Sequence, residues 1–137
     1  MTFSVDQAQG SVPVTIMAIQ GDLDGTNYKD LIELAGKAQQ EGANNILIDM
    51  SELIFMSSAG LVSLLNIAKM MRGEASPESE DGWDALHDID RDRDSGIQEH
   101  VKLLKPSPKV MKTLDISGMK RYFEIFTDKE SAVASFG

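Results

Sequence analysis

The chain contains no cysteine, which excludes disulfide bonds, thiol nucleophiles and metal sites built from thiolates. No apolar run approaches the roughly 20 residues that a membrane-spanning helix needs, so we expect no membrane insertion. The first ten residues lack the basic and apolar stretches of a signal peptide, and the expected location is the cytoplasm. No phosphate-binding glycine loop, zinc signature or catalytic histidine spacing occurs. We therefore expect a protein that is not an enzyme and needs no cofactor.

Negative charge is concentrated in one segment of the chain. The formal net charge is −9, and residues 73–99 hold ten acidic side chains against two arginines. The other residues carry 12 acids and 11 bases with no basic stripe, which gives no support to nucleic-acid binding. Gly, Ser, Pro, Asp and Glu together make up most of the segment, which is poor in core-forming residues. We interpret it as an acidic, flexible insertion in one domain spanning residues 1–137.

The acidic segment also offers a candidate calcium site. Four carboxylates have the spacing of the oxygen ligands in an EF-hand loop: Asp88, Asp90, Asp92 and Glu99. At the position where that loop needs glycine, this chain has Arg93. The composition therefore favours a solvated acidic loop, and calcium binding that orders the loop is the alternative.

Hydrophobic periodicity predicts alternating strands and helices. Alternating or continuous apolar patterns predict strands at 3–7, 12–20, 45–50, 101–104 and 122–126. Helical spacing and start signals predict helices from a Thr26 cap to Gly42, after Ser57 and Ser58, from Pro108 to Gly118, and after a cap at Asp128 or Thr127. The order β-β-α-β-α-(insert)-β-α-β-α predicts an α/β fold in which about four helices pack on a mixed sheet.

The junction between the buried strand at 45–50 and the following helix carries the most information. Ser57 and Ser58 stand directly before an apolar helical run that begins at Ala59. The first N–H groups of a helix are unpaired and its dipole is positive there, so a hydroxyl or a phosphate is stabilised at that point. A serine at this position is therefore either a helix cap or a phosphorylation switch.

Several short motifs occur in one order along the chain: GDLD at 21–24, DMS at 49–51, FMSSAGL at 55–61, KPSP at 105–108 and SGM at 117–119. With the order of elements, they make the chain resemble the STAS domains, in particular the bacterial anti-sigma factor antagonists. The resemblance covers everything except the segment at 73–99. The antagonists usually have Asp-Ser-Ser/Thr-Gly-Leu at the phosphorylated site, where this chain has Ser57, Ser58, Ala59, Gly60 and Leu61.

The resemblance implies that Ser58 accepts a phosphate, with Ser57 as the weaker candidate. It also implies a partner-binding face made of Asp24, Ser57, Ser58, Gly60 and Leu61. The implied partners are an anti-sigma factor that is also a serine kinase, and a serine phosphatase that resets the switch.

A phosphate on Ser58, close to Asp24 and Asp49, would concentrate negative charge on the docking face and so control partner binding. Through that binding the domain would control transcription. The alternative is a scaffold or ligand-binding STAS subunit of a signalling or transport assembly, in which Ser58 is only a helix cap.

Overall fold

The computed structural model describes residues 2–71 and 98–136. Three of the four candidate calcium ligands, and most of the acidic segment, lie outside the described residues. Glu99, the fourth ligand, is exposed, and no group of three or more His, Asp or Glu side chains within 2–71 and 98–136 could hold a metal ion. None of the helices in these ranges has the length and apolar character needed to span a bilayer.

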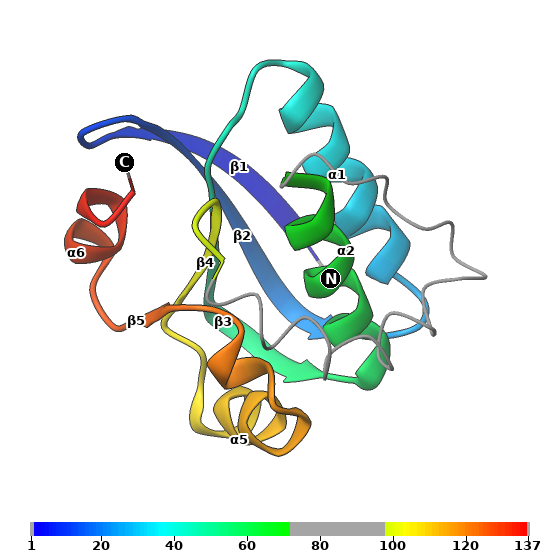
Figure 1. Cartoon of the computed structure of the whole chain (residues 1–137). Helices are drawn as coiled ribbons and strands as arrows, with labels where there is room; N and C mark the ends of the chain where they lie inside the picture. The colour runs from blue at the N-terminus through cyan, green and yellow to red at the C-terminus, as the bar shows by residue number, and fades with distance from the viewer. Residues whose placement is uncertain (1, 72–97, 137) are drawn as a thin grey trace.

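A five-stranded sheet forms the centre of the fold (Figure 1). Its strands lie in the order β1 (Thr2–Gln9), β2 (Pro13–Leu23), β3 (Ile46–Met56), β4 (Val101–Leu104) and β5 (Ile125–Phe126). β1 pairs antiparallel with β2 in a hairpin, and the neighbours from β2 to β5 are parallel. The carboxyl ends of β2 to β5 therefore share one edge of the sheet, called here the carboxyl edge.

Helices cover both faces of the sheet (Figure 1). One face carries α1 (Tyr28–Gln40), α2 (Ser58–Met71), α5 (Pro108–Ser117) and the 3-10 turn η2 (Met119–Arg121). The other face carries α6 (Lys129–Ala134), which packs on a smaller apolar cluster. The predicted α/β fold with a mixed sheet and four α-helices is confirmed for the described residues.

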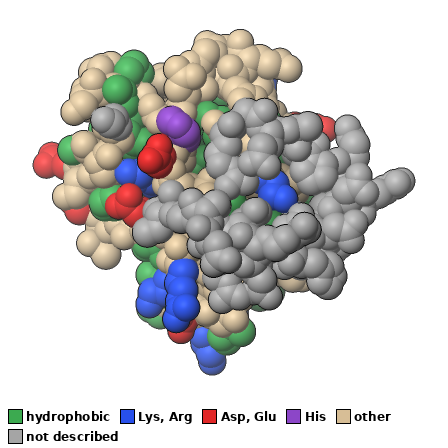
Figure 2. All heavy atoms as spheres, in the orientation of Figure 1, with side chains coloured by type: hydrophobic (Ala, Val, Ile, Leu, Met, Phe, Trp, Pro, Cys, Tyr) green, Lys and Arg blue, Asp and Glu red, His purple; other side chains and the backbone are tan. Residues whose placement is uncertain are grey.

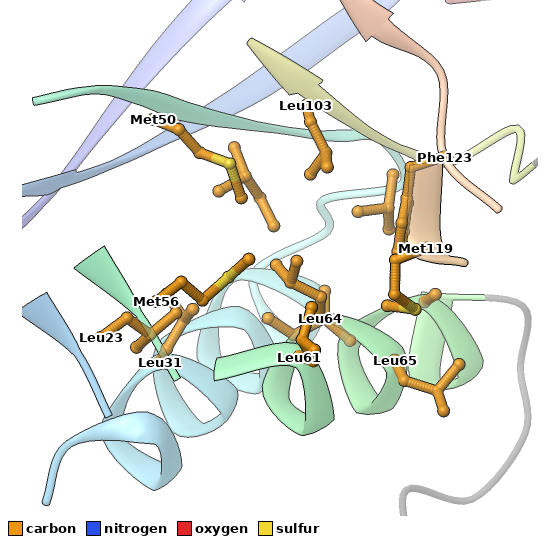
Figure 3. Close-up of a cluster of buried hydrophobic side chains, with 14 of the residues drawn as sticks. Leu23, Leu31, Met50, Met56, Leu61, Leu64, Leu65, Leu103, Met119 and Phe123 are labelled. Carbon is orange, nitrogen blue, oxygen red and sulfur yellow. The ribbon is translucent and has the colours of Figure 1, made fainter. Parts of the chain in front are cut away.

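The larger core lies between the sheet and α2. Met50 and Leu103 point from the sheet toward Leu61 and Leu64 of α2, as Figure 3 shows. Every residue of α2 from Ala59 to Ala68 is buried. A helix that is apolar all round is stable only when it is enclosed, so α2 is the central helix of the domain.

Strand β3 continues six residues beyond the predicted end at Met50. The β2–β3 register shifts twice, and at each shift β3 contains one more residue than β2. These two bulges place every third residue of the strand end in the core, namely Met50, Leu53 and Met56. The predicted end of this strand at residue 50 was wrong, because a period of three is not the alternation that identifies a strand.

Two further predictions are corrected. Tyr122 and Phe123, predicted to begin the last strand, are instead buried next to η2 with their rings in edge contact, and only Ile125 and Phe126 pair with β4. Thr26, predicted to cap the first helix, is not its cap, because the helix begins after Asn27. The predicted start at Pro108 is confirmed, and of the two candidate caps for the last helix, Asp128 and Thr127, the structure shows Asp128.

The two chain ends that flank residues 72–97 lie at the edge opposite the carboxyl edge. Helix α2 starts at the carboxyl end of β3 and runs back toward the opposite edge of the sheet. Its end lies beside the end of α1, because Gln39 in the last turn of α1 donates a hydrogen bond to the Met70 carbonyl. On the other side, the His100 carbonyl accepts a hydrogen bond from the N–H of Ile46, the first residue of β3. The acidic segment therefore leaves and rejoins the described fold at the edge away from Ser58.

The start of α2 approaches the strand ends very closely at Gly60. A Cβ atom added to Gly60 would lie 2.4 Å from Cγ of Met56 and 3.2 Å from Cγ and Cδ2 of Leu23. Real Cβ atoms essentially never come within 3.0 Å of a neighbour, so only glycine allows this approach. Gly60 thereby sets the position of the helix start relative to β2 and β3.

Helix α6 is held to the sheet by the buried side chain of Lys102 in β4. Its Nζ atom donates to the carbonyl and the hydroxyl of Ser135, at 3.1 and 3.0 Å, and lies 3.4 Å from Glu124 Oε1. The same atom lies 4.8 Å from the centre of the Phe136 ring. Burial of an unpaired ammonium group destabilises a protein. These contacts together offset the cost of burying the charge of Lys102.

We expect Gly60→Ala to lower the free energy of unfolding by about 1–2 kcal/mol, because overpacking outweighs the gain in helix propensity. Gly36→Ala in α1 is the matched control, since its added Cβ would lie 3.7 Å from Met70 Sδ, an ordinary contact. That variant should stabilise the fold by ~0.5–1 kcal/mol. Urea denaturation measures both, and a stabilised Gly60→Ala protein would contradict the close approach.

We expect Lys102→Ala to destabilise the domain by about 2 kcal/mol, because it removes buried hydrogen bonds and the packing against α6. Glu124→Gln should cost less than ~1 kcal/mol, since the Glu124 side chain is 44% exposed. Thermal and urea unfolding of the two variants make the comparison. Equal losses would show that the ion pair, and not the contact with α6, is the important interaction.

Candidate functional site

Asp24 lies in a rigid turn directly after β2. Its Oδ1 atom accepts hydrogen bonds from the Thr26 N–H at 2.9 Å and the Thr26 hydroxyl at 2.6 Å. The Asn27 side chain closes the turn by accepting from the Asp24 N–H and donating to the Asp22 carbonyl. The hydrogen bonds from Thr26, first the hydroxyl and then the N–H, hold the pKa of Asp24 below its ordinary value. Asp24 is therefore an ionised, fixed carboxylate at neutral pH.

The end of β2 is tied directly to the start of α2. The Ser57 N–H donates to the Leu23 carbonyl at 2.9 Å, one residue before Asp24. The expectation that Asp24 lies close to the start of this helix is confirmed, because β2 and β3 are parallel neighbours whose ends pair at Leu23 and Met56.

The two serines differ in accessibility and in position. The Leu61 N–H donates to the Ser57 carbonyl at 3.2 Å, so Ser57 occupies the N-cap position and Ser58 is the first helical residue. The Ser57 hydroxyl is buried and has no hydrogen-bond partner among the described residues. Ser58 is exposed. Ser58 therefore does not occupy the cap position that the scaffold or ligand-binding alternative gave it.

The structure corrects three other expectations for this face. Gly60 and Leu61 are buried in the core, so they position the helix start and offer no surface to a partner. Asp49 lies seven residues before Met56 on β3, about 20 Å back along the strand, so it does not add charge beside Ser58. Of the acidic side chains that the sequence suggested, only Asp24 lies at the site.

The other side of the carboxyl edge is formed by the segment after β4. Lys105 has a φ of 51°, in the left-handed region, and its N–H donates to the Phe126 carbonyl at 2.8 Å. This conformation turns the chain into Ser107, whose hydroxyl accepts from the Val110 N–H and caps α5. Pro108 occupies the first turn of α5, where its missing N–H costs nothing.

Sequence reasoning missed the exposed aromatic side chain beside the serines. Phe55 is 36% exposed and lies three residues before Ser58. The Lys109 Nζ atom lies 5.2 Å from the centre of its ring, a cation–π contact between α5 and β3. The contact arises because the end of β3 extends beyond β4 and α5 packs beside it. No local pattern in the sequence predicts this contact between Lys109 and Phe55.

Comparisons with known proteins agree with this fold. The STAS domain family matches residues 6–75. BtrV of Bordetella bronchiseptica, assigned by its name to the anti-sigma factor antagonists, is 26% identical over 137 residues, covering 99% of this chain and 95% of BtrV.

Two solved structures share the fold. An anti-sigma factor antagonist of Thermotoga maritima, so described in its name, has a TM-score of 0.68 at 18% identity, covering 95% of this chain and 90% of that one. The unphosphorylated form of the anti-sigma factor antagonist SpoIIAA has a TM-score of 0.66 at 19% identity, covering 96% and 93%. With the family match over half of its residues and this shared fold, the chain belongs to the STAS domain family.

Proposed function

We propose that this STAS domain is an anti-sigma factor antagonist whose partner binding is switched by phosphorylation of Ser58. The observation that carries the proposal is the exposed Ser58 hydroxyl at the open start of α2, beside the fixed carboxylate of Asp24. The first N–H groups of α2 point out of the helix end, where they stabilise a negative group. BtrV and SpoIIAA, both named as antagonists, support the role.

The switch works through charge. A phosphate adds about 1.5 to 2 negative charges at neutral pH and three acceptor oxygens. On Ser58 these charges lie close to Asp24, whose pKa is held low. A partner surface that fits the neutral hydroxyl is repelled or loses its contacts once the phosphate is present. The rigid turn at residues 22–27 prevents Asp24 from moving away.

The partners follow from this role. One is an anti-sigma factor that is also a serine kinase and phosphorylates Ser58, and another is a serine phosphatase that removes the phosphate. The domain is the substrate of the phosphotransfer, and it acts in the cytoplasm on transcription. Ser57 is the poorer acceptor because its hydroxyl is buried, so a kinase would reach it only after the start of α2 opens.

We expect a single phosphate on Ser58 in protein purified from its own cells, and its loss in a Ser58→Ala variant. Intact mass and peptide mapping measure the modification under growth, starvation and stress. Phosphorylated protein should bind the anti-sigma factor at least about tenfold more weakly, a difference of ~1.4 kcal/mol. Calorimetric titration of the two forms gives that ratio.

Ser57→Ala is the matched control for this experiment. It removes a buried hydroxyl without a described partner, so folding and phosphorylation of Ser58 should both persist. If the phosphate maps to Ser57, the accessibility argument is wrong. If neither serine carries phosphate in any condition, the scaffold or ligand-binding role replaces the switch.

A further inference from the structure

The segment from Lys105 to Arg121 has the opposite charge to the chain as a whole. It contains five basic residues, Lys105, Lys109, Lys112, Lys120 and Arg121, against the single acid Asp115, in a chain of net charge −9. All five basic residues are exposed. Figure 2 shows Lys and Arg side chains gathered at the lower end of the molecule, where α5 lies in Figure 1.

One face of α5 combines this charge with apolar surface. Lys109, Lys112 and Ile116 are separated by three and four residues, so they share the side of the helix opposite the buried Val110 and Leu114. Ile116 is 76% exposed, the largest exposed fraction among the exposed large apolar side chains of the described residues. With Phe55, these three side chains make a mixed basic and apolar surface, called here the α5 face.

The charges on the α5 face are not neutralised within the described chain. Neither Lys109 nor Lys112 forms a salt bridge with any residue in 2–71 or 98–136. The acid of the helix, Asp115, lies toward the flank of the face and not between the two lysines. Uncompensated like charges beside exposed apolar groups are complementary to an acidic surface that also carries apolar side chains.

The α5 face continues the proposed switch. Lys109 contacts Phe55, three residues before Ser58. Along the carboxyl edge, the order of the strands places Asp24 after β2, Ser58 after β3 and Lys105 after β4. The phosphoacceptor therefore lies between an acidic side and a basic side of one edge.

We propose that the α5 face binds an acidic, partly apolar segment of the protein partner, an inference that rests on the proposed function of the domain. Binding places glutamate or aspartate of the partner beside Lys109 and Lys112, and an apolar side chain between Ile116 and Phe55. A phosphate on Ser58 adds negative charge next to this basic surface and lowers its attraction for the acidic segment. The α5 face thus makes partner binding sensitive to Ser58 phosphorylation.

The test uses the full chain and two probes. The first is a short fluorescent peptide of alternating glutamate and leucine, compared with the same peptide carrying glutamine in place of glutamate. The second is the kinase that phosphorylates Ser58. We expect the acidic peptide to bind the wild-type chain, and binding to weaken as salt rises from about 0.05 to 0.3 M. The double variant Lys109→Glu/Lys112→Glu should weaken binding of both probes about tenfold or more.

Lys37→Glu is the matched control for Lys112→Glu, because both replace an exposed helical lysine and change the net charge equally. Lys37→Glu should change the affinity for the acidic peptide and for the kinase by less than about twofold, whereas Lys112→Glu should weaken both severalfold. Ile116→Ser tests the apolar part of the α5 face. It should weaken binding of the peptide and of the kinase without changing how that binding depends on salt. At saturating kinase the lysine variants should still be phosphorylated on Ser58.

Three results would overturn the proposal. One is equal binding of the acidic and uncharged peptides, and another is an equal loss in Lys37→Glu and Lys112→Glu, which would reflect net charge alone. The third is peptide binding that appears only when the Asp and Glu residues of 74–94 are replaced by Asn and Gln, because the chain itself would then occupy the face. If the acidic peptide binds at α5 but no kinase phosphorylates Ser58, the result supports the acidic docking site and contradicts only the phosphorylation switch.

Discussion

The close contact between the start of α2 and the ends of β2 and β3 is the constraint on which the site depends. A glycine at position 60 lets the helix backbone lie against Leu23 and Met56. The Ser57 N–H then reaches the Leu23 carbonyl, which fixes the first turn of α2 next to Asp24. Ser58 faces solvent as a result of this seating, while Leu61 and the rest of the helix enter the core.

Much of the fold was predictable because its elements carry local signals. A proline in the first turn, an aspartate cap and regular apolar spacing mark helices α5, α6 and α1 independently of their neighbours. The extended end of β3 was not predictable, because its bulges arise from pairing with β2 and replace alternation by a period of three. Tyr122 and Phe123 misled for a related reason, since an apolar pair packs equally well in a turn and in a strand.

The sequence predicted which residues meet at the site, but not which of their side chains are exposed. Parallel neighbours imply that Asp24 and the two serines meet at one edge. Which hydroxyl faces water depends on how far the start of α2 packs into the core, and the local sequence Ser57, Ser58, Ala59 does not indicate this. The Phe55–Lys109 contact depends on where α5 packs relative to a distant strand, so it required the three-dimensional arrangement.

The points where residues 72–97 leave and rejoin the described fold have a consequence for how such a domain can diversify. Residues 72–97 join Met71 to Gln98, and both of these ends lie at the edge of the sheet away from Ser58. Because doubling the length of a loop adds only ~0.6 kcal/mol of closure cost, a connection between these two points tolerates large changes in length. Ser58 and the two points where residues 72–97 join the described fold thus lie at opposite edges of the sheet, so a change in this connection does not require a compensating change at the start of α2.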